Sequence, residues 1–197
     1  MAPNDLLVLT FANAAAFESW LADQPPDAPG TWLRFAKQAA AEITVSKSDA
    51  IDCALAHGWI DGQIGRVDAH YFKTRFTPRT VRSTWSQMNC ERVERLSAAG
   101  RMTPRGLARV DEAKADGRWA RAYAPQSQAE PSDDLQMALN ASPAARDLFD
   151  ELDSANRYAV LYRVQQARTP EKRAAKIAVL VAQLARGDTI HPRPRRR

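Results

Sequence analysis

The chain has 197 residues, of which 45% are hydrophobic and 26% are charged. This composition is typical of a folded protein with one domain and a small appendage, and it excludes a disordered, a fibrous and a disulfide-stapled chain. The formal net charge is +5, but residues 186–197 contain five arginines and one aspartate, a net of +4, which leaves +1 for the other 185 residues. The basic charge is therefore concentrated in a C-terminal tail.

The apolar segments and the cysteines of the sequence indicate the cellular compartment in which the protein is expected to reside. No stretch approaches the roughly 20 consecutive apolar residues that a membrane helix needs, and no basic region precedes the short apolar run at the start. We therefore expect a cytoplasmic protein without a membrane span. Cys53 and Cys90 are the only cysteines and form no CxxC pair, which fits a reducing compartment. Cys53 and His57 are four residues apart on a predicted helix, but no second pair of ligands lies nearby, so we expect no metal and no other cofactor.

Helical and strand patterns alternate over the first 122 residues. Phe17, Trp20 and Leu21 have the spacing of one helical face, and the Pro/Gly-rich stretch 24–30 ends that helix. Serine or threonine caps and terminal glycines mark the later helices. The predicted helices cover about 13–23, a segment from Ser46 or Ser48 to Gly58, 84–99 and 103–117; the predicted strands cover 31–37, 59–64 and 70–77.

The predicted strand at 70–77 has two different faces. Alternate residues of a strand point to opposite faces of the sheet. The even-numbered residues here are mostly apolar and the odd-numbered residues carry the cations, so we expect one face to be part of the core and the other to be cationic. Residues 65–68 have the composition of a turn and join this strand to the one at 59–64. The two sets are Phe72, Thr74 and Phe76 on the core face, and Tyr71, Lys73, Arg75 and Thr77 on the other.

The second half of the chain has a different organisation. Residues 123–133 are rich in Ala, Pro, Gln and Ser and are predicted to be a linker. Residues 134–186 have helical spacing throughout, with Ser-Pro and Thr-Pro helix starts, and 187–197 form a basic tail that we expect to be disordered. The predicted fold class is α+β: a small antiparallel sheet packed with helices in residues 1–122, followed by a small helical module.

The strongest candidate for a binding site lies between residues 58 and 89. Asp61 and Arg79 can flank a pocket for an anionic or planar ligand, with Arg75 adding charge and Trp59 or Trp85 supplying a flat apolar wall. The serine and asparagine at the start of the next predicted helix complete the set. The candidate ligand-binding residues are Trp59, Asp61, Arg75, Arg79, Trp85, Ser86 and Asn89.

The same residues also fit a structural interpretation. Asp61 and Arg79 would form a partly buried ion pair, the two tryptophans would fill the core, and a serine would cap the helix at 84–99. For Trp59 the core position is favoured. For Arg79 and Asn89 both interpretations stay open, because the end of a strand and the start of a helix are places where ligands commonly approach.

Patterns of catalytic residues are weak. Ser83 and Ser86 have no histidine nearby in the sequence. Asp61 and Asp68 bracket the predicted hairpin and would face each other across it, yet aspartate is common in turns for conformational reasons. The glycines between 58 and 65 match no phosphate-binding loop. The sequence therefore gives no positive evidence for an enzyme.

Several unusual strings occur in a fixed order along the chain. They are WL at 20–21, GWIDG at 58–62, RFTPR at 75–79, STWSQMN at 83–89, GRMTPRG at 100–106 and ARTPEKR at 167–173. Together they resemble the YdeI/OmpD-associated family, also called bacteriocin-protection proteins, over about residues 10–185. The resemblance implies a bacterial stress-protection protein with a small C-terminal helical module. It also implies a role in tolerance to bacteriocins or cationic antimicrobial peptides, with an outer-membrane porin as an associate.

Three functions follow from these observations. The first is stress protection by binding a protein partner, which the resemblance favours. The second is binding, with or without catalysis, of a small anionic or planar ligand around Asp61, Arg79 and Asn89. The third is nucleic-acid binding through the tail, which is the weakest because the rest of the chain is nearly neutral. The tail residues that would carry it are Arg193, Arg195, Arg196 and Arg197.

Overall fold

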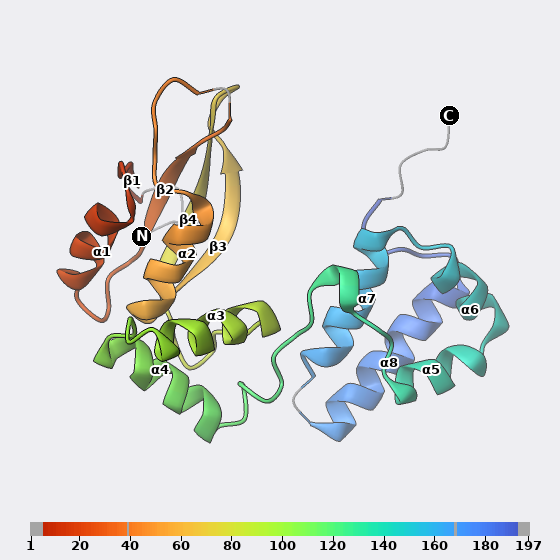
Figure 1. Cartoon of the computed structure of the whole chain (residues 1–197). Coiled ribbons are helices and arrows are strands. Elements are labelled where there is room, and N and C mark those ends of the chain that lie inside the picture. Colours follow the sequence, from red (N-terminus) through yellow and green to blue (C-terminus); the bar gives the residue numbers. More distant parts are fainter. Residues whose placement is uncertain (1–5, 39, 168, 193–197) are drawn as a thin grey trace. The chain divides into compact units, whose positions relative to one another are not determined.

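The computed structural model describes residues 6–38, 40–167 and 169–192. The chain divides into two compact units, Met1–Ala122 and Tyr123–Arg197 (Figure 1). Each unit packs around buried apolar residues of its own. The first unit combines a sheet with helices, whereas the second is built from helices. The α+β fold class is therefore confirmed.

The first unit contains, within the described residues, a four-stranded sheet in the order β1-β2-β4-β3. Its strands are β1 (Val8–Leu9), β2 (Thr31–Ala36), β3 (Trp59–Arg66) and β4 (Tyr71–Pro78). β2, β4 and β3 are antiparallel, but β1 pairs parallel to β2. The sheet is therefore mixed: the predicted strands are antiparallel, and β1, which was not predicted, adds a parallel pair at one edge. A two-residue strand shows no alternation, and its pairing with residues 24 positions away is invisible to a local pattern.

Two helices cover one face of this sheet, α1 (Ala14–Ala22) and α2 (Lys47–Ala56). Their apolar sides meet the residues of β2, β3 and β4 that point to the same face. The predicted core parity of β4 is confirmed, since Thr74 and Phe76 are fully buried. The buried residues of this core are Phe17, Leu21, Leu33, Phe35, Val45, Ala50, Cys53, Ala54, Trp59 and Phe76.

The β3–β4 hairpin is longer than predicted and contains a bulge. Asp61 pairs with Phe76 and Ile64 pairs with Thr74, so β3 has one extra residue between these two pairs. The turn is closed by Asp68, whose Oδ1 accepts hydrogen bonds from the backbone N–H groups of His70 at 2.7 Å and Tyr71 at 2.8 Å. Asp68 therefore has the conformational role in the turn that its residue type suggested, while Asp61 pairs with Phe76 of β4.

The helices α3 (Gln87–Ala98) and α4 (Pro104–Ala115) complete the first unit. α3 begins three residues later than predicted, because Ser86 is its N-cap and accepts a hydrogen bond from the backbone N–H of Asn89 at 3.1 Å. Thr103 caps α4 in the same way. These helices form a second core, whose buried residues are Leu55, Trp85, Cys90, Val93, Leu96, Val110, Ala113 and Ala122.

The second unit begins with a short 3-10 helix, η2 (Gln126–Gln128), and continues with α5 (Asp133–Asn140), α6 (Pro143–Asp150), α7 (Ser154–Gln165) and α8 (Pro170–Ala185). The segment predicted to be a linker packs against α7, since Tyr123 and Tyr162 meet edge to face with ring centres 5.2 Å apart. Asn156 of α7 also binds the backbone of His191 through two hydrogen bonds. The four tail arginines, Arg193, Arg195, Arg196 and Arg197, lie outside the described residues.

In the described part of the chain, no helix combines the length and the apolar character needed to cross a membrane.

Candidate functional site

Trp59, the first of the predicted site residues, belongs to the core. Its side chain is fully buried, and its ring meets that of Trp20 edge to face with centres 5.6 Å apart. Trp59 follows Gly58, whose φ of +75° is the left-handed conformation that favours glycine at the end of α2. The core interpretation of Trp59 therefore agrees with its position.

Arg79 and Trp85 contact each other within the segment that joins β4 to α3. The Arg79 guanidinium lies 3.5 Å from the centre of the Trp85 ring and donates a hydrogen bond to the Thr84 carbonyl at 3.1 Å. Trp85 in turn packs against Trp119, with ring centres 4.9 Å apart. Only 4% of Arg79 is exposed, so its charge faces the protein interior. Arg79 thus joins the start of the connecting segment to its end, and Trp85 contacts Trp119 of the helical core.

Arg118 fastens the same segment from the other side. Its Nη1 donates hydrogen bonds to the carbonyl of Ser83 at 3.1 Å and to that of Thr80 at 3.4 Å, while its Nε binds Asp116 at 2.6 Å. The Ser83 hydroxyl oxygen accepts a hydrogen bond from the backbone N–H of Thr80 at 3.0 Å. The segment after β4 is thus held by two arginines, and sequence reasoning identified only one of them.

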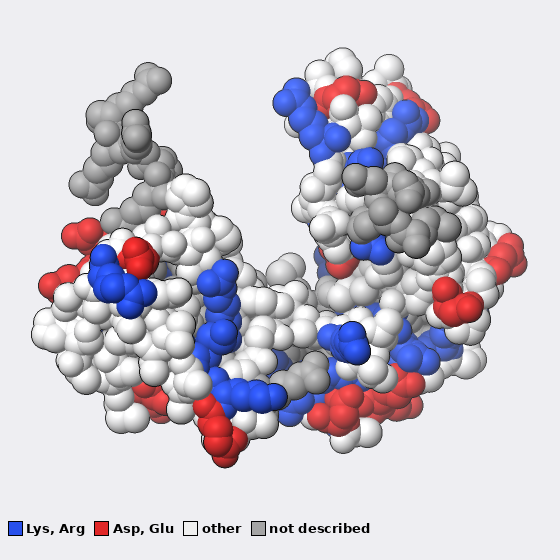
Figure 2. All heavy atoms as spheres, turned by 180° about the vertical axis from the view of Figure 1, so that it is seen from behind, with Lys and Arg blue, Asp and Glu red and all other residues white. Residues whose placement is uncertain are grey.

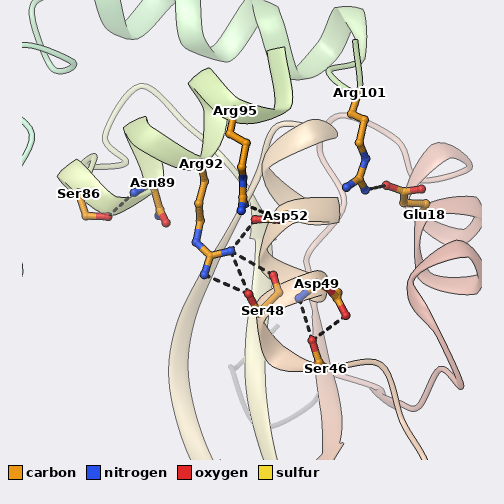
Figure 3. A network of polar contacts seen from close by, with 10 residues as sticks. All are labelled: Glu18, Ser46, Ser48, Asp49, Asp52, Ser86, Asn89, Arg92, Arg95 and Arg101. Carbon is orange, nitrogen blue, oxygen red and sulfur yellow. Dashed lines mark hydrogen bonds and ion pairs between the residues drawn. The ribbon is translucent and has the colours of Figure 1, made fainter. Parts of the chain in front are cut away.

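The remaining candidates lie on different elements. Asp61 is half-buried beside the bulge of β3, and Arg75 is half-buried on β4, where it pairs with Trp32 of β2. Ser86 and Asn89 are joined at the start of α3 by the N-cap hydrogen bond (Figure 3). The structure thus brings together two pairs of the seven residues: Arg79 with Trp85, and Ser86 with Asn89.

A network of charges that the sequence did not reveal joins α2 to α3 (Figure 3). Asp52, in the middle of α2, binds Arg92 at 2.5 Å and Arg95 at 2.7 Å. Arg92 also donates hydrogen bonds to the hydroxyl and the carbonyl of Ser48. The Asp52 carboxylate is nearly buried, so the network braces the two helices from within.

The two thiols are poorly suited to nucleophilic chemistry. Burial raises the pKa of Cys53 to about 12, with a further rise from the neighbouring Glu18 carboxylate. Burial raises the pKa of Cys90 to about 11, although Arg79 acts in the opposite direction. Burial also lowers the pKa of His57. Among the described residues, no group of three or more His, Cys, Asp or Glu side chains is placed to hold a metal ion.

The second unit contains a groove between α7 and α8 with a volume of about 650 Å³. Arg163, Lys172 and Lys176 provide three positive charges along it, and none of the described residues that line it carries a carboxylate. None of these three cations forms an ion pair with another residue in the described part of the chain. Figure 2 shows a row of basic side chains on one face of this unit, with acidic side chains elsewhere on the same face. The rest of the lining is Tyr162, Gln166, Ala167, Ala175 and Val179.

The position of the two lysines is unfavourable for α8 itself. Thr169 caps this helix and Pro170 occupies its first turn, so Lys172 lies near the positive end of the helix dipole. Lys172 and Lys176 are also four residues apart, a spacing at which like charges destabilise a helix by a few tenths of a kcal/mol. Neither the helix dipole nor the spacing of the two lysines favours their charges, whereas a negatively charged binding partner would.

Two known family models match the chain, one in each of its compact units. Residues 9–109 match the model described as "Domain of unknown function (DUF8412)", which spans just over half of the chain. The chain belongs to this family. Residues 128–187 match a second model, described as "Bacteriocin-protection, YdeI or OmpD-Associated". No curated protein and no solved structure matches the chain.

The predicted resemblance to the bacteriocin-protection family is thus confirmed for residues 128–187, which include the string at 167–173. The strings between 58 and 106 fall instead within the DUF8412 region. The α7–α8 groove lies wholly inside the bacteriocin-protection region.

Sequence reasoning missed this groove, although part of its signal was present. Lys172, Lys176 and Val179 are spaced by four and three residues and therefore share one face of α8. The buried apolar face of the same helix, formed by Ile177, Leu180 and Leu184, lies next to this face around the helix. Arg163 comes from α7, and only the packing of the two helices places it beside the lysines.

Proposed function

We propose that this chain is a stress-protection protein that acts by binding a partner in the α7–α8 groove rather than by catalysis. The observation that carries the proposal is the set of three cations, Arg163, Lys172 and Lys176, along a groove whose described lining has no carboxylate. The groove lies in the region that matches the bacteriocin-protection family, which supports a protective role. The high pKa values of Cys53 and Cys90 favour binding over thiol chemistry.

The test compares two variants that change the net charge of α8 by the same amount. Lys172→Gln with Lys176→Gln removes two positive charges from the groove. Ala174→Glu with Ala178→Glu adds two negative charges at exposed positions of α8 outside the groove lining. Helix content and thermal unfolding of both proteins are measured first, to show that each variant is folded.

The readout is the survival of cells that produce each variant during exposure to a bacteriocin or a cationic antimicrobial peptide. We expect wild-type protein and the Ala174→Glu, Ala178→Glu variant to protect cells, and the double-glutamine variant to lose protection. Equal protection by the double-glutamine variant would show that the groove is not the functional surface. No protection by the wild-type protein would reject the protective role itself.

The predicted ligand site at Asp61, Arg79 and Asn89 remains an alternative proposal. The contacts of Arg79 with Trp85 and Thr84 support a structural role for that residue, and its substitution separates the two interpretations. The nucleic-acid proposal rests on arginines outside the described residues, and deletion of residues 193–197 tests it through the salt dependence of binding.

A further inference from the structure

The dimensions of the α7–α8 groove suit a helical segment. On one side it is lined by the last turn of α7, and on the other by residues 172–179 of α8, which span about 10 Å along the helix axis. That length corresponds to about two turns of a docked helix. Ala167 and Ala175 have small side chains, so a partner backbone can approach closely at these positions.

The chemistry of the lining is divided between apolar and charged parts. Val179 is 54% exposed and lines the groove together with the two alanines. Arg163 on α7 and the two lysines on α8 provide charge along both sides. A lining that combines apolar residues with cations from both helices is complementary to a helix that has one apolar face and flanking carboxylates.

We propose that the groove receives an acidic amphipathic helix of a protein partner. Its apolar side chains pack on Ala167, Ala175 and Val179, and its carboxylates lie against Arg163, Lys172 and Lys176. The inference rests on the proposed function and adds the class of the partner. A cationic antimicrobial peptide is an unsuitable occupant of the groove, because the three positive charges of the groove would repel it. Protection then works through an acidic partner and not by direct capture of the peptide.

The probe is a designed, fluorescently labelled peptide of about 15 residues with leucines on one helical face and glutamates beside them. Two control peptides accompany it: one has lysine at every glutamate position, and the other has the same composition in a scrambled order that removes the apolar face. Binding of each to the full chain is measured by fluorescence anisotropy at low salt, and again after the salt is raised from about 0.05 to about 0.5 M.

We expect the acidic amphipathic peptide to bind, and both control peptides to bind at least roughly tenfold more weakly. The double-glutamine variant Lys172→Gln, Lys176→Gln should weaken binding of the acidic peptide by roughly tenfold, and high salt should do the same. Val179→Ser should weaken it by a few-fold at both salt concentrations, since it removes an apolar contact. The Ala174→Glu, Ala178→Glu variant should stay within about twofold of the wild type at high salt.

Three results would overturn the inference. Binding of the lysine peptide as tightly as the glutamate peptide would show that charge does not select the occupant. Equal binding of the scrambled peptide would make the groove a general anion site, open to nucleic acid or phosphate. Unchanged binding in the double-glutamine variant would place the peptide elsewhere on the chain.

The two proposals fail in different ways. If the groove lysines are needed for cell survival but the acidic peptide does not bind, the proposed function stands and the partner belongs to another class. If the acidic peptide binds in the groove but the double-glutamine variant protects cells as well as the wild type does, the groove is a docking site and the proposed protective function of the groove is wrong.

Discussion

The guanidinium group of Arg79 lies 3.5 Å from the centre of the Trp85 ring. Both side chains are buried, and the same guanidinium donates a hydrogen bond to the carbonyl of Thr84. A cation–π contact contributes more free energy when the cation is buried than when it is exposed to water. This contact therefore stabilises the segment between β4 and α3.

We expect Arg79→Ala to lower the free energy of unfolding by about 2–4 kcal/mol, the sum of a desolvated cation–π contact and a charged hydrogen bond. Chemical denaturation measures this loss. The matched control is Arg82→Ala in the same segment, an exposed position where we expect a change within about 0.5 kcal/mol. Unchanged stability of the Arg79 variant, together with loss of a bound small molecule in native mass spectrometry, would support the ligand-site alternative instead.

Asp52 binds two arginines that differ in exposure, since 21% of the Arg92 side chain is accessible to solvent against 62% for Arg95. Double-mutant cycles with Asp52→Asn should therefore give a coupling free energy of about 1–2 kcal/mol with Arg92→Met and no more than about 0.5 kcal/mol with Arg95→Met. Urea unfolding of the single and double variants provides both values. Equal couplings would contradict the role of burial.

Gly106 of α4 is placed against the C-terminal end of α2. A Cβ atom at this position would lie 2.1 Å from the carbonyl oxygen of Ala56, which also accepts two hydrogen bonds from Thr103. We expect Gly106→Ala to destabilise the first unit by about 2–3 kcal/mol, because backbone has to move. Gly62→Ala is the control, since its Cβ would meet only one atom, at 3.7 Å, and its thermal unfolding should change little. Equal stability of the two variants would show that α4 can shift without cost.

Asp134 contributes a pH dependence to the second unit. Hydrogen bonds from Arg173 at 2.5 and 3.0 Å hold the pKa of its carboxyl well below the ordinary value of 3.8. At pH values between the pKa of Asp134 in the folded chain and its pKa in the unfolded chain, the unfolded chain binds more protons. The stabilisation from the Asp134–Arg173 contact is therefore complete above about pH 4 and is lost as the pH falls below that value. We expect a loss on the order of 0.5 kcal/mol, since 43% of the Asp134 side chain is exposed.

The measurement is thermal unfolding of the full chain, followed by circular dichroism from about pH 6 to about pH 2. Asp134→Asn should be less stable than the wild type near neutral pH, and the difference should shrink in acid. Asp133→Asn, the exposed neighbouring position, is the control. A constant difference between wild type and Asp134→Asn at all pH values would contradict the assignment.

Much of the fold could be predicted from the sequence because helix caps and strand alternation depend only on residues close together in the chain. Thr103 and Ser46 cap their helices through hydrogen bonds to N–H groups three residues ahead, and such caps are legible in a sequence. The alternation along β4 identified its buried face for the same reason. β1 was missed because its pairing depends on a contact across 24 positions, and the start of α3 was placed early because two serines compete for one cap.

The candidate sites also have a part that the sequence predicted and a part that only the tertiary structure showed. The sequence by itself identified the region around Arg79 as special and related the end of the chain to a protective family. It also carried the spacing of Lys172 and Lys176. Only the tertiary structure decided that Arg79 points inward onto Trp85, and that Arg163 joins the lysines across the α7–α8 groove. The physical reason is that helical or strand period fixes the direction of a side chain within its own element, whereas its neighbours from other elements are chosen by packing of the whole unit.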